Sequence, residues 1–233
     1  MKLYIVIPWF NEISVVDRIV PRFREALAAL VASGRADAGS RLLFVDDGSD
    51  DGTRDLLKAW SDRSDDIELL MLSRNRGQQF AIVQGLKRSR ESGAEVVVTM
   101  DCDGQDDPSV LGQMVDSFRA GSQVVYGVRC DRTSDGFFNR TAALLFYRIM
   151  RMLGSRALYN HAEFRLMSAE VVDAVIAGWR EDMFLRAFVP TLGFKGSVVE
   201  YRRLARVAGM SHYGFWSLVR LSFRAMAEAI CRR

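Results

Sequence analysis

Four short apolar runs, each followed by a polar loop, constrain the fold of this chain more than any other feature. The runs cover residues 3–7, 42–45, 67–72 and 95–100, and segments with helical periodicity separate most of them. This alternation is typical of a mostly parallel sheet, because parallel neighbours need a crossover connection. The sequence therefore predicts an α/β fold whose polar loops meet at the carboxyl ends of the strands, where open sheets bind ligands.

The helices and later strands are placed by apolar spacing and by capping residues. The first helix is expected from Ser14 to about Val31, with Asp17 as a capping-box partner. Asp107 and Pro108 are typical of an N-cap followed by proline at the first helical position. The helices expected after the first cover residues 52–60, 77–92, 108–120, 137–153 and 216–230. The later strands are expected over residues 123–129, 164–168 and 195–203.

The chain length and composition favour one substantial folded domain. It has 233 residues, of which 49% are hydrophobic and 26% are charged. No run reaches the roughly 18 apolar residues that a membrane-spanning helix needs. We expect residues 1–214 to form the domain and residues 215–233 to form a C-terminal amphipathic helix. Three cysteines without paired spacing favour a reduced, cytoplasmic setting.

The positive charges of the chain are concentrated in two segments. Residues 136–162 contain four arginines and no acidic residue, and residues 201–233 contain seven arginines and one glutamate. This asymmetry predicts a basic face. No nucleic-acid-binding motif accompanies the charge, so an anionic membrane surface or a lipid phosphate is the expected partner rather than nucleic acid. The amphipathic segments over 137–153 and 216–230 can either pack on the sheet or rest on a membrane interface.

Residues 101–105, Asp-Cys-Asp-Gly-Gln, directly follow an apolar strand. Alternate side chains of an extended segment share a face, so Asp101, Asp103 and Gln105 can point to one place. Two carboxylates and an amide oxygen suit Mg²⁺ or Mn²⁺, which take few protein ligands and complete their shell with substrate phosphates. A solvated acidic loop is the alternative interpretation.

Seven segments in a fixed order carry a family resemblance. They cover residues 7–12, 45–49, 72–75, 100–106, 126–129, 163–167 and 206–213. With these segments in this order, the chain resembles glycosyltransferase family 2, in the branch of dolichyl-phosphate mannose synthase and bacterial polyprenyl-phosphate glycosyltransferases. The resemblance implies a GT-A type Rossmann-like domain that binds a nucleoside-diphosphate sugar and a divalent cation.

The resemblance also implies which residues bind the nucleotide sugar. The nucleotide pocket is expected to contain Pro8, Phe10, Glu12, Val45 and Asp47. In it, Glu12 lies near the ribose, and Asp47 accepts hydrogen bonds from the base. The alternative for Asp47 is an ordinary acidic turn, which Asp and Gly favour.

The remaining expected donor contacts lie around the diphosphate. Cys102 is counted among the nucleotide-sugar-binding residues as a small filler between the metal ligands. Arg129 is expected to reach the phosphates with its forked donors. Arg206 and His212 are expected on a loop that closes over the diphosphate, although most relatives carry Lys in place of His212. An exposed histidine without a role is the alternative for His212.

The predicted catalytic residues are Glu163, Asp103 and Arg165. Glu163 stands where relatives usually carry Asp, as the base or as the group that orients the acceptor, and Arg165 could bind an acceptor phosphate. The alternative is a structural ion pair between Glu163 and Arg165. A phosphate acceptor is already largely anionic at neutral pH, with a second pKa of about 6, so it needs orientation more than deprotonation.

These observations predict a metal-dependent inverting glycosyltransferase that uses a polyprenyl phosphate as acceptor. We expect it in the cytoplasm, peripherally at the inner face of the cell membrane. Two alternatives are the same donor site with a saccharide hydroxyl as acceptor, and a non-catalytic nucleotide-sugar-binding module. A dinucleotide-dependent dehydrogenase fits poorly, because no Gly-x-Gly-x-x-Gly follows the first strand.

Overall fold

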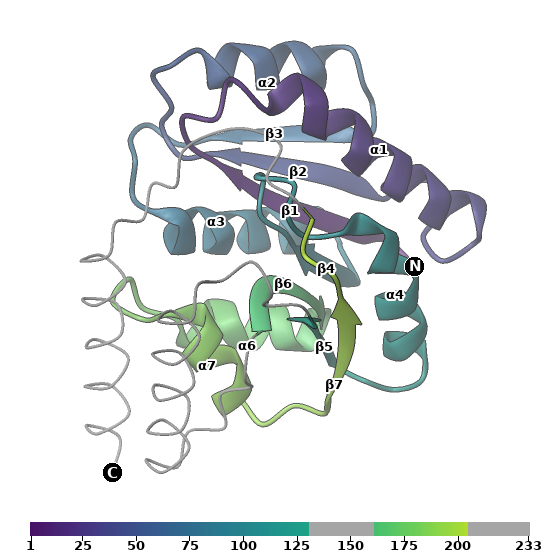
Figure 1. The fold of residues 1–233 in the computed structure, drawn as a ribbon. Helices are drawn as coiled ribbons and strands as arrows, with labels where there is room; N and C mark the ends of the chain where they lie inside the picture. The colour runs from purple at the N-terminus through teal and green to yellow at the C-terminus, as the bar shows by residue number, and fades with distance from the viewer. Residues whose placement is uncertain (131–160, 205–233) are drawn as a thin grey trace.

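The computed structural model describes residues 1–130 and 161–204. These residues form one seven-stranded sheet in the order β3-β2-β1-β4-β6-β5-β7 (Figure 1). The strands are β1 (Leu3–Trp9), β2 (Arg41–Asp46), β3 (Ile67–Met71), β4 (Val96–Thr99), β5 (Val124–Arg129), β6 (His161–Ser168) and β7 (Gly196–Tyr201). The α/β fold with a mostly parallel sheet is therefore confirmed. The helices expected over residues 137–153 and 216–230 lie outside the described residues.

One strand runs against all the others. Strands β1 to β4 are parallel to one another, and β7 is parallel to β5. Strand β6 is inserted between β4 and β5 and is antiparallel to both. The beginning of β6 therefore lies at the edge where its neighbours end. This topology brings Glu163 of β6 to the same edge as the loop that follows β4.

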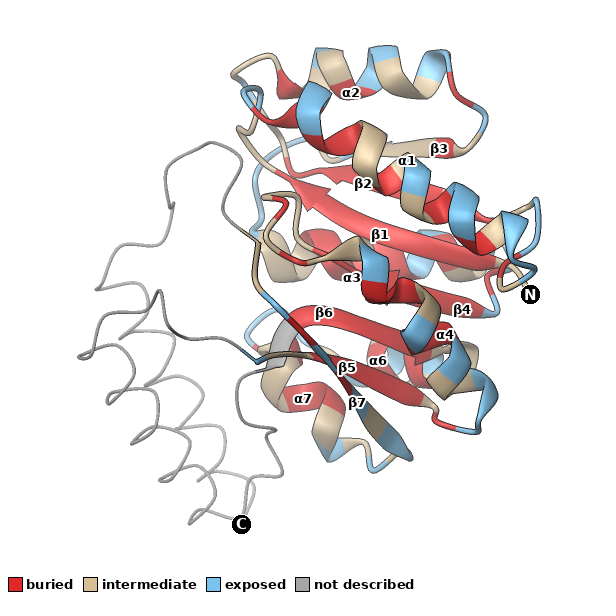
Figure 2. Cartoon of the chain, turned by 45° about the vertical axis from the view of Figure 1, so that its right-hand side comes forward, coloured by how far each residue is buried: buried red, intermediate tan, exposed pale blue. Residues whose placement is uncertain are grey.

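Helices cover both faces of the sheet. They are α1 (Val16–Ala32), α2 (Thr53–Asp62), α3 (Gln78–Glu91), the 3₁₀ turn η1 (Pro108–Val110), α4 (Leu111–Arg119), α6 (Ala169–Gly178) and α7 (Leu185–Thr191). Buried side chains of α1 and α4 pack with one face, and those of α3, α6 and α7 pack with the other. The inner strands are consequently buried on both sides, as the largely red β1, β2, β5 and β6 in Figure 2 show, whereas the edge strands β3 and β7 are partly exposed.

The capping box predicted at the start of the first helix is wrong. Helix α1 begins at Val16, and no side chain caps its N-terminus. The Asp17 carboxylate instead accepts a hydrogen bond of 2.9 Å from the indole N–H of Trp60 in α2. A contact between two helices thus takes the place of the local capping box. The second capping prediction is confirmed, since Asp107 accepts the Ser109 N–H at 2.9 Å before Pro108.

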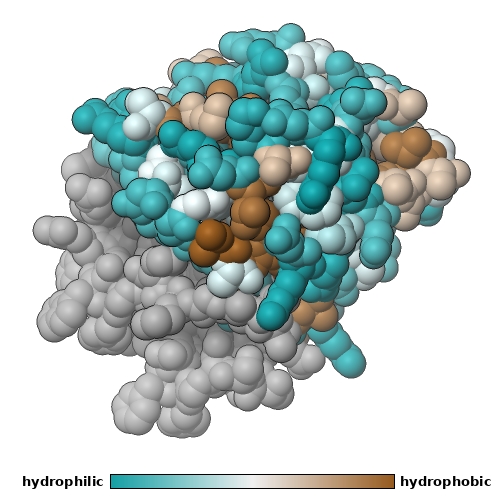
Figure 3. Space-filling view, turned by 90° about the horizontal axis from the view of Figure 1, so that it is seen from above, coloured by the Kyte–Doolittle hydropathy of each residue, from teal (hydrophilic) through white to brown (hydrophobic). Residues whose placement is uncertain are grey.

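The outer surface of the described residues is largely polar. The face seen from above in Figure 3 is mainly hydrophilic, with a few hydrophobic groups. The large hydrophobic side chains that are exposed in the described part are Ile13, Met71 and Val198, which come from three different places in the fold. None of the described helices has the length and apolar character needed to cross a bilayer.

Candidate active site

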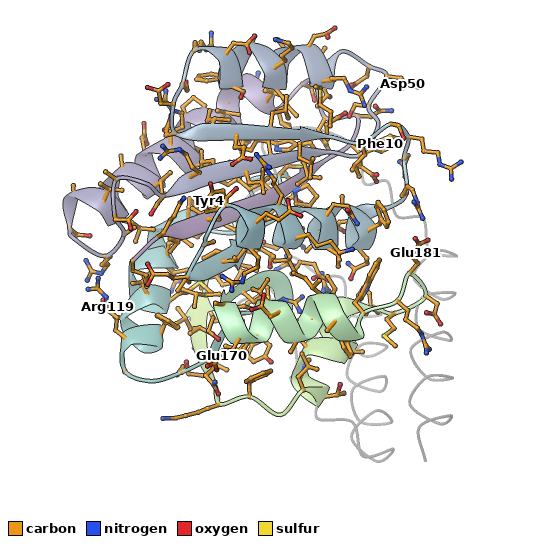
Figure 4. All side chains as sticks on the ribbon, turned by 180° about the vertical axis from the view of Figure 1, so that it is seen from behind. Tyr4, Phe10, Asp50, Arg119, Glu170 and Glu181 are labelled. Carbon is orange, nitrogen blue, oxygen red and sulfur yellow. The ribbon has the colours of Figure 1, made fainter. Side chains whose placement is uncertain are left out.

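The polar loops meet at the carboxyl-terminal edge of the parallel strands. Figure 4 shows Phe10, after β1, and Asp50, after β2, at the same end of the molecule as Glu181, while Arg119 lies at the opposite end. The loops after β3 and β4 also begin at this edge, because β3 is parallel to β2 and β4 is parallel to β1. The predicted site residues of the described ranges therefore come from one edge of one sheet.

The loop after β1 is clasped to the loop after β2. The Asn11 side chain donates to Asp50 Oδ1 at 2.8 Å and accepts the Asp50 N–H at 3.0 Å. The Asn11 N–H also reaches Ser49 Oγ at 3.1 Å, and the Glu12 N–H reaches Thr53 Oγ1 at 2.9 Å. Asn11 has a positive φ of 51°, which asparagine tolerates better than most residues. The clasp fixes the backbone that carries Phe10 and Glu12.

Asp46 and Asp47 are both buried, and both bind protein groups. The Asp46 carboxylate pairs with the Arg54 guanidinium at 2.7 Å. Asp47 accepts the backbone N–H groups of Arg76 and Gly77, at 2.9 and 2.8 Å. Burial raises the pKa of Asp47, although these two N–H groups act in the opposite direction. Asp47 therefore anchors the loop after β3, and its binding of a base stays a prediction.

The loops after β2 and β3 touch at Gly48. This residue has a positive φ of 78°, and a Cβ built on it would lie 2.5 Å from the Asn75 nitrogen. Only glycine permits this close backbone approach. The contact holds residues 74–77 against the predicted nucleotide pocket.

The other predicted nucleotide-pocket residues differ in exposure. Phe10, Glu12 and Cys102 are partly exposed at the sheet edge, whereas Pro8 and Val45 are buried. The Val45 side chain is completely buried in the core on the α3 side of the sheet. A base could therefore meet Val45 only along its main chain. Burial raises the pKa of the Cys102 thiol well above its usual range, which agrees with a filler role.

Asp101 lies in a concentration of negative charge. Burial raises its pKa to about 7, and the carboxylates of Asp106 and Asp103 add to the shift. Its Oδ1 accepts a hydrogen bond of 2.6 Å from the Gln78 side chain at the start of α3. A cation bound here would relieve the repulsion between the carboxylates, so the residues present fit a divalent metal.

The other two predicted metal ligands make contacts within the protein. Asp103 Oδ1 accepts the Gln105 N–H at 3.0 Å, which tightens the loop after β4. The Gln105 side-chain oxygen accepts a hydrogen bond from Arg203, and the Gln105 carbonyl accepts the Leu204 N–H at 3.0 Å. An amide oxygen has two lone pairs, so one remains available for a metal. In residues 1–130 and 161–204, no group of three or more His, Cys, Asp or Glu is arranged to hold a metal.

Asp106 joins the loop after β4 to the ends of β5 and β7. It is 1% exposed, and its Oδ1 accepts hydrogen bonds from the Tyr201 hydroxyl and, at 3.2 Å, from Arg129. Arg129 also donates to the Tyr201 oxygen at 3.1 Å. Asp106 Oδ2 is buried and has no hydrogen-bond partner among the described residues, which adds to the demand for positive charge near Asp101. The contact of Arg129 with a diphosphate stays a prediction.

Glu163 and Arg165 form the ion pair that was the structural alternative. Both are 1% exposed, and the Arg165 guanidinium binds Glu163 Oε2. Arg165 also donates to the Leu185 carbonyl at 3.2 Å. Burial lowers the pKa of Arg165, while the charge of Glu163 acts in the opposite direction. Arg165 thus reaches Glu163 from the protein interior.

The other oxygen of Glu163 is bound from the solvent side. Oε1 accepts hydrogen bonds from Arg186 Nε at 3.0 Å and from the Gln79 side chain at 3.3 Å. The Gln79 amide oxygen accepts the Leu185 N–H at 2.9 Å, which joins α3 to the start of α7. The Glu163 carboxylate is therefore held on both oxygens by positively charged groups.

Sequence reasoning did not find several residues of this site. Gln78, Gln79 and Arg186 reach it from helices α3 and α7 rather than from a loop at the end of a strand. The sequence carries one signal for the glutamines, which follow the third motif segment, but none for Arg186. The predicted loop residues Arg206 and His212 lie outside the described residues.

Comparison with known proteins gives the family. The sequence profile of glycosyl transferase family 2 matches residues 4–176. The chain belongs to this family. It is therefore a glycosyltransferase, and the family resemblance in its motifs is confirmed.

Relatives of this glycosyltransferase align along nearly all of it. The uncharacterized glycosyltransferase YkoT of Bacillus subtilis (strain 168) is 37% identical over 226 residues, which are 97% of this chain and 67% of YkoT. The bactoprenol glucosyl transferase of Shigella phage SfV is 30% identical over 232 residues, which are 98% of this chain and 72% of that protein. The chain thus spans about two thirds of the length of these relatives.

A solved structure supports the fold assignment. The mannosyltransferase PcManGT from Pyrobaculum calidifontis, in complex with GDP-Man and Mn²⁺, superposes with a TM-score of 0.67 at 18% identity. The match covers 98% of this chain and 64% of PcManGT. At this identity the likeness concerns the fold, and it confirms the GT-A type of architecture.

Proposed function

We propose that this glycosyltransferase moves a sugar from a nucleoside-diphosphate sugar to a polyprenyl phosphate, with inversion at the anomeric carbon. The bactoprenol glucosyl transferase relative supports a lipid-phosphate acceptor, because its name couples a sugar to a polyprenyl lipid. The PcManGT complex supports a nucleotide-sugar donor and a divalent metal.

One observation carries the choice of acceptor. Glu163 accepts hydrogen bonds from Arg165 on one oxygen and from Arg186 on the other. A carboxylate held in this way is a poor proton acceptor, because taking up a proton would weaken both ion pairs. A sugar hydroxyl would need such a base, whereas a phosphate is already an anion and can attack directly.

The donor side is assigned to the loops after β1, β2 and β4. Phe10 offers an aromatic face, Glu12 a carboxylate for the ribose, and Asp47 holds residues 76–77 beside the base. Asp101, Asp103 and Gln105 would hold Mg²⁺ or Mn²⁺, which as a Lewis acid stabilises negative charge on the leaving diphosphate. Arg129 is assigned to the same phosphates.

The location that we propose follows the charge pattern of the chain. Residues 1–214 are assigned to the catalytic domain, and residues 215–233 to an amphipathic helix beside the membrane. A lipid acceptor requires the site to work at a membrane surface, and the arginine-rich segments suit an anionic one. We place the protein in the cytoplasm, at the inner face of the membrane.

A transfer assay tests the function directly. The protein is incubated with Mn²⁺ or Mg²⁺, a panel of nucleotide sugars and a short-chain polyprenyl phosphate, and glycolipid and nucleoside diphosphate are measured. Glycolipid from one donor is expected, and its formation should stop when EDTA removes the metal. Nucleotide release with a saccharide acceptor but not with the lipid would contradict the assigned acceptor. Nucleotide binding without turnover would favour a non-catalytic module.

The variant Asp103→Asn tests the metal assignment, and Asp107→Asn is its matched control. Both replace one carboxylate by an amide in the same loop. Asp107 caps η1, a role that asparagine fills equally well, so this control should keep full activity. Asp103→Asn should lose metal-dependent turnover and should bind nucleoside diphosphate more weakly in the presence of Mn²⁺ by calorimetry. Unchanged metal-dependent turnover would refute the role of Asp103.

A further inference from the structure

The geometry points to Arg186 as the residue that binds the phosphate group of the acceptor. This inference rests on the proposed function, since it concerns the same site and a phosphate-bearing acceptor. Arg186 lies in the first turn of α7, outside every motif segment that identifies the family. Binding of the acceptor phosphate is a role distinct from the donor contacts assigned above.

Arg186 and Arg165 bind the same carboxylate from opposite sides. The Arg165 side chain is 1% exposed, whereas the Arg186 side chain is 31% exposed. A phosphate arriving from solvent can therefore reach Arg186 but not the guanidinium of Arg165. The phosphate contact expected for Arg165 is better assigned to Arg186. Arg165 holds Glu163 from the protein interior.

A contact of the Arg186 side chain and a contact of its neighbour Leu185 hold Arg186 in position. Its Nε donates to Glu163 Oε1 at 3.0 Å. The preceding residue, Leu185, donates its N–H to Gln79 Oε1 at 2.9 Å. Gln79 also binds Glu163, so α3, β6 and α7 are joined at one point. A guanidinium held in this way loses little freedom when it binds a ligand, which favours affinity.

Arg186 is joined to the predicted metal site through helix α3. Gln79 and Arg186 bind the same oxygen of Glu163, and Gln78, the residue before Gln79, binds Asp101 at 2.6 Å. The acceptor oxygen must approach the anomeric carbon, which is attached to the diphosphate that the metal would hold. A phosphate on Arg186 would therefore stand next to the reacting carbon.

Two arginines of the described residues bind the single carboxylate of Glu163. A neutral saccharide gives no reason for two positive charges at this point, whereas an anionic phosphate does. The planar fork of arginine matches phosphate oxygens better than the point charge of lysine does.

Steady-state kinetics on the full chain test this role with Arg186→Gln, Arg186→Lys and the control Arg180→Gln. Arg180 is 72% exposed, pairs with Asp182 and lies six residues away, so its loss removes the same charge outside the site. Activity is measured against a short-chain polyprenyl phosphate and against the nucleotide sugar, and the melting temperature of each variant is recorded.

In Arg186→Gln, KM for the polyprenyl phosphate should rise about 10- to 100-fold, the worth of one charge-assisted hydrogen bond. KM for the nucleotide sugar should stay within about twofold, because the assigned donor contacts lie in other loops. The KM of Arg186→Lys for the polyprenyl phosphate should lie between those of the wild type and Arg186→Gln, since lysine keeps the charge and loses the fork. Arg180→Gln should match the wild type. A merely structural role would lower the melting temperature and leave acceptor KM unchanged.

Two other results would overturn the inference, and they are distinguishable. If the wild type transfers sugar to the lipid phosphate and Arg186→Gln keeps the acceptor KM, Arg186 does not bind the acceptor, and the proposed function stands. If the wild type makes no glycolipid from any donor, the proposed function fails, and the inference fails with it.

Discussion

At the scale of single residues, the site depends on how each carboxylate is paired. Asp101 lies beside other carboxylates, and its pKa is raised to about 7, first by burial and then by Asp106 and Asp103. Glu163, by contrast, is held by Arg165 and Arg186. The carboxylate of Asp101 is thus suited to bind a cation, whereas the carboxylate of Glu163 is suited to orient other groups.

The pairing of Glu163 predicts the pH dependence of Glu163→Gln. The variant should have a lower kcat, because the amide cannot neutralise Arg165 and Arg186. The acidic limb of its kcat profile should nevertheless stay where it is in the wild type, since a phosphate acceptor needs no base. The profile is measured at saturating metal and below the melting temperature of the variant.

Stability measurements provide the control for this variant. Removing one partner of a buried pair costs about 3–5 kcal/mol, so the free energy of unfolding should drop by an amount of that order. Glu163→Asp keeps the charge and should lose less stability. An acidic limb that disappears in Glu163→Gln would show that Glu163 is a general base after all.

At the scale of elements, loops are held in place by other loops. Asn11 provides a clear case, because its side chain exchanges two hydrogen bonds with Asp50 while its backbone keeps a positive φ. Asn11→Ala should lose the clasp and strain the backbone, at a cost of about 1–3 kcal/mol. Asn11→Gly loses the clasp alone and should cost less. Urea unfolding of both variants measures the difference, and equal stability to the wild type would contradict the clasp.

The anchoring of the loop after β3 predicts a pH-dependent stability at Asp47. Its pKa is raised in the folded protein, first by burial. A carboxyl group with a raised folded pKa stabilises the fold most below its unfolded pKa of about 3.9, and this contribution is lost as the pH rises through the folded pKa. Asp47→Asn does not titrate. The stability of the wild type relative to the variant should therefore fall over the pH range above about 4.

Urea unfolding of the two proteins across this pH range makes the measurement. Asp47→Asn should be less stable throughout, because an amide oxygen cannot replace both acceptors of the Arg76 and Gly77 N–H groups. A stability difference that grows with pH would mean that the folded pKa of Asp47 is lowered instead.

At the scale of the whole molecule, the distribution of charge predicts membrane binding. The basic segments 136–162 and 201–233 should attract the full chain to vesicles that contain anionic lipids. Flotation at low salt measures this binding, and salt should weaken it because screening shortens the Debye length from about 30 Å at 0.01 M to about 10 Å at 0.1 M. Neutral vesicles are the control. Failure to bind anionic vesicles at low salt would contradict a peripheral location.

Much of the architecture was predictable from local patterns. The apolar runs ending near Trp9 and Asp46 became buried parallel strands, because a run of buried side chains suits a sheet covered on both faces. The run ending near Met71 became the partly exposed edge strand β3. Asp107 and Pro108 marked a helix start correctly. The capping box at Ser14 and Asp17 failed because Trp60, which is 43 residues further along the chain than Asp17, offered a better partner.

The sequence by itself determined the order of strands and helices along the chain, the family, the loop that carries Asp101 and Asp103, and the segment that carries Glu163. These features are local, since they depend on periodicity and on short motifs. Only the tertiary structure decided that Glu163 lies between Arg165 and Arg186. Strand β6 had to run antiparallel between β4 and β5, and α7 had to pack beside it, before Arg186 could bind a carboxylate 23 positions earlier in the chain. Contacts of this kind depend on how elements are packed, which no local pattern in the chain records.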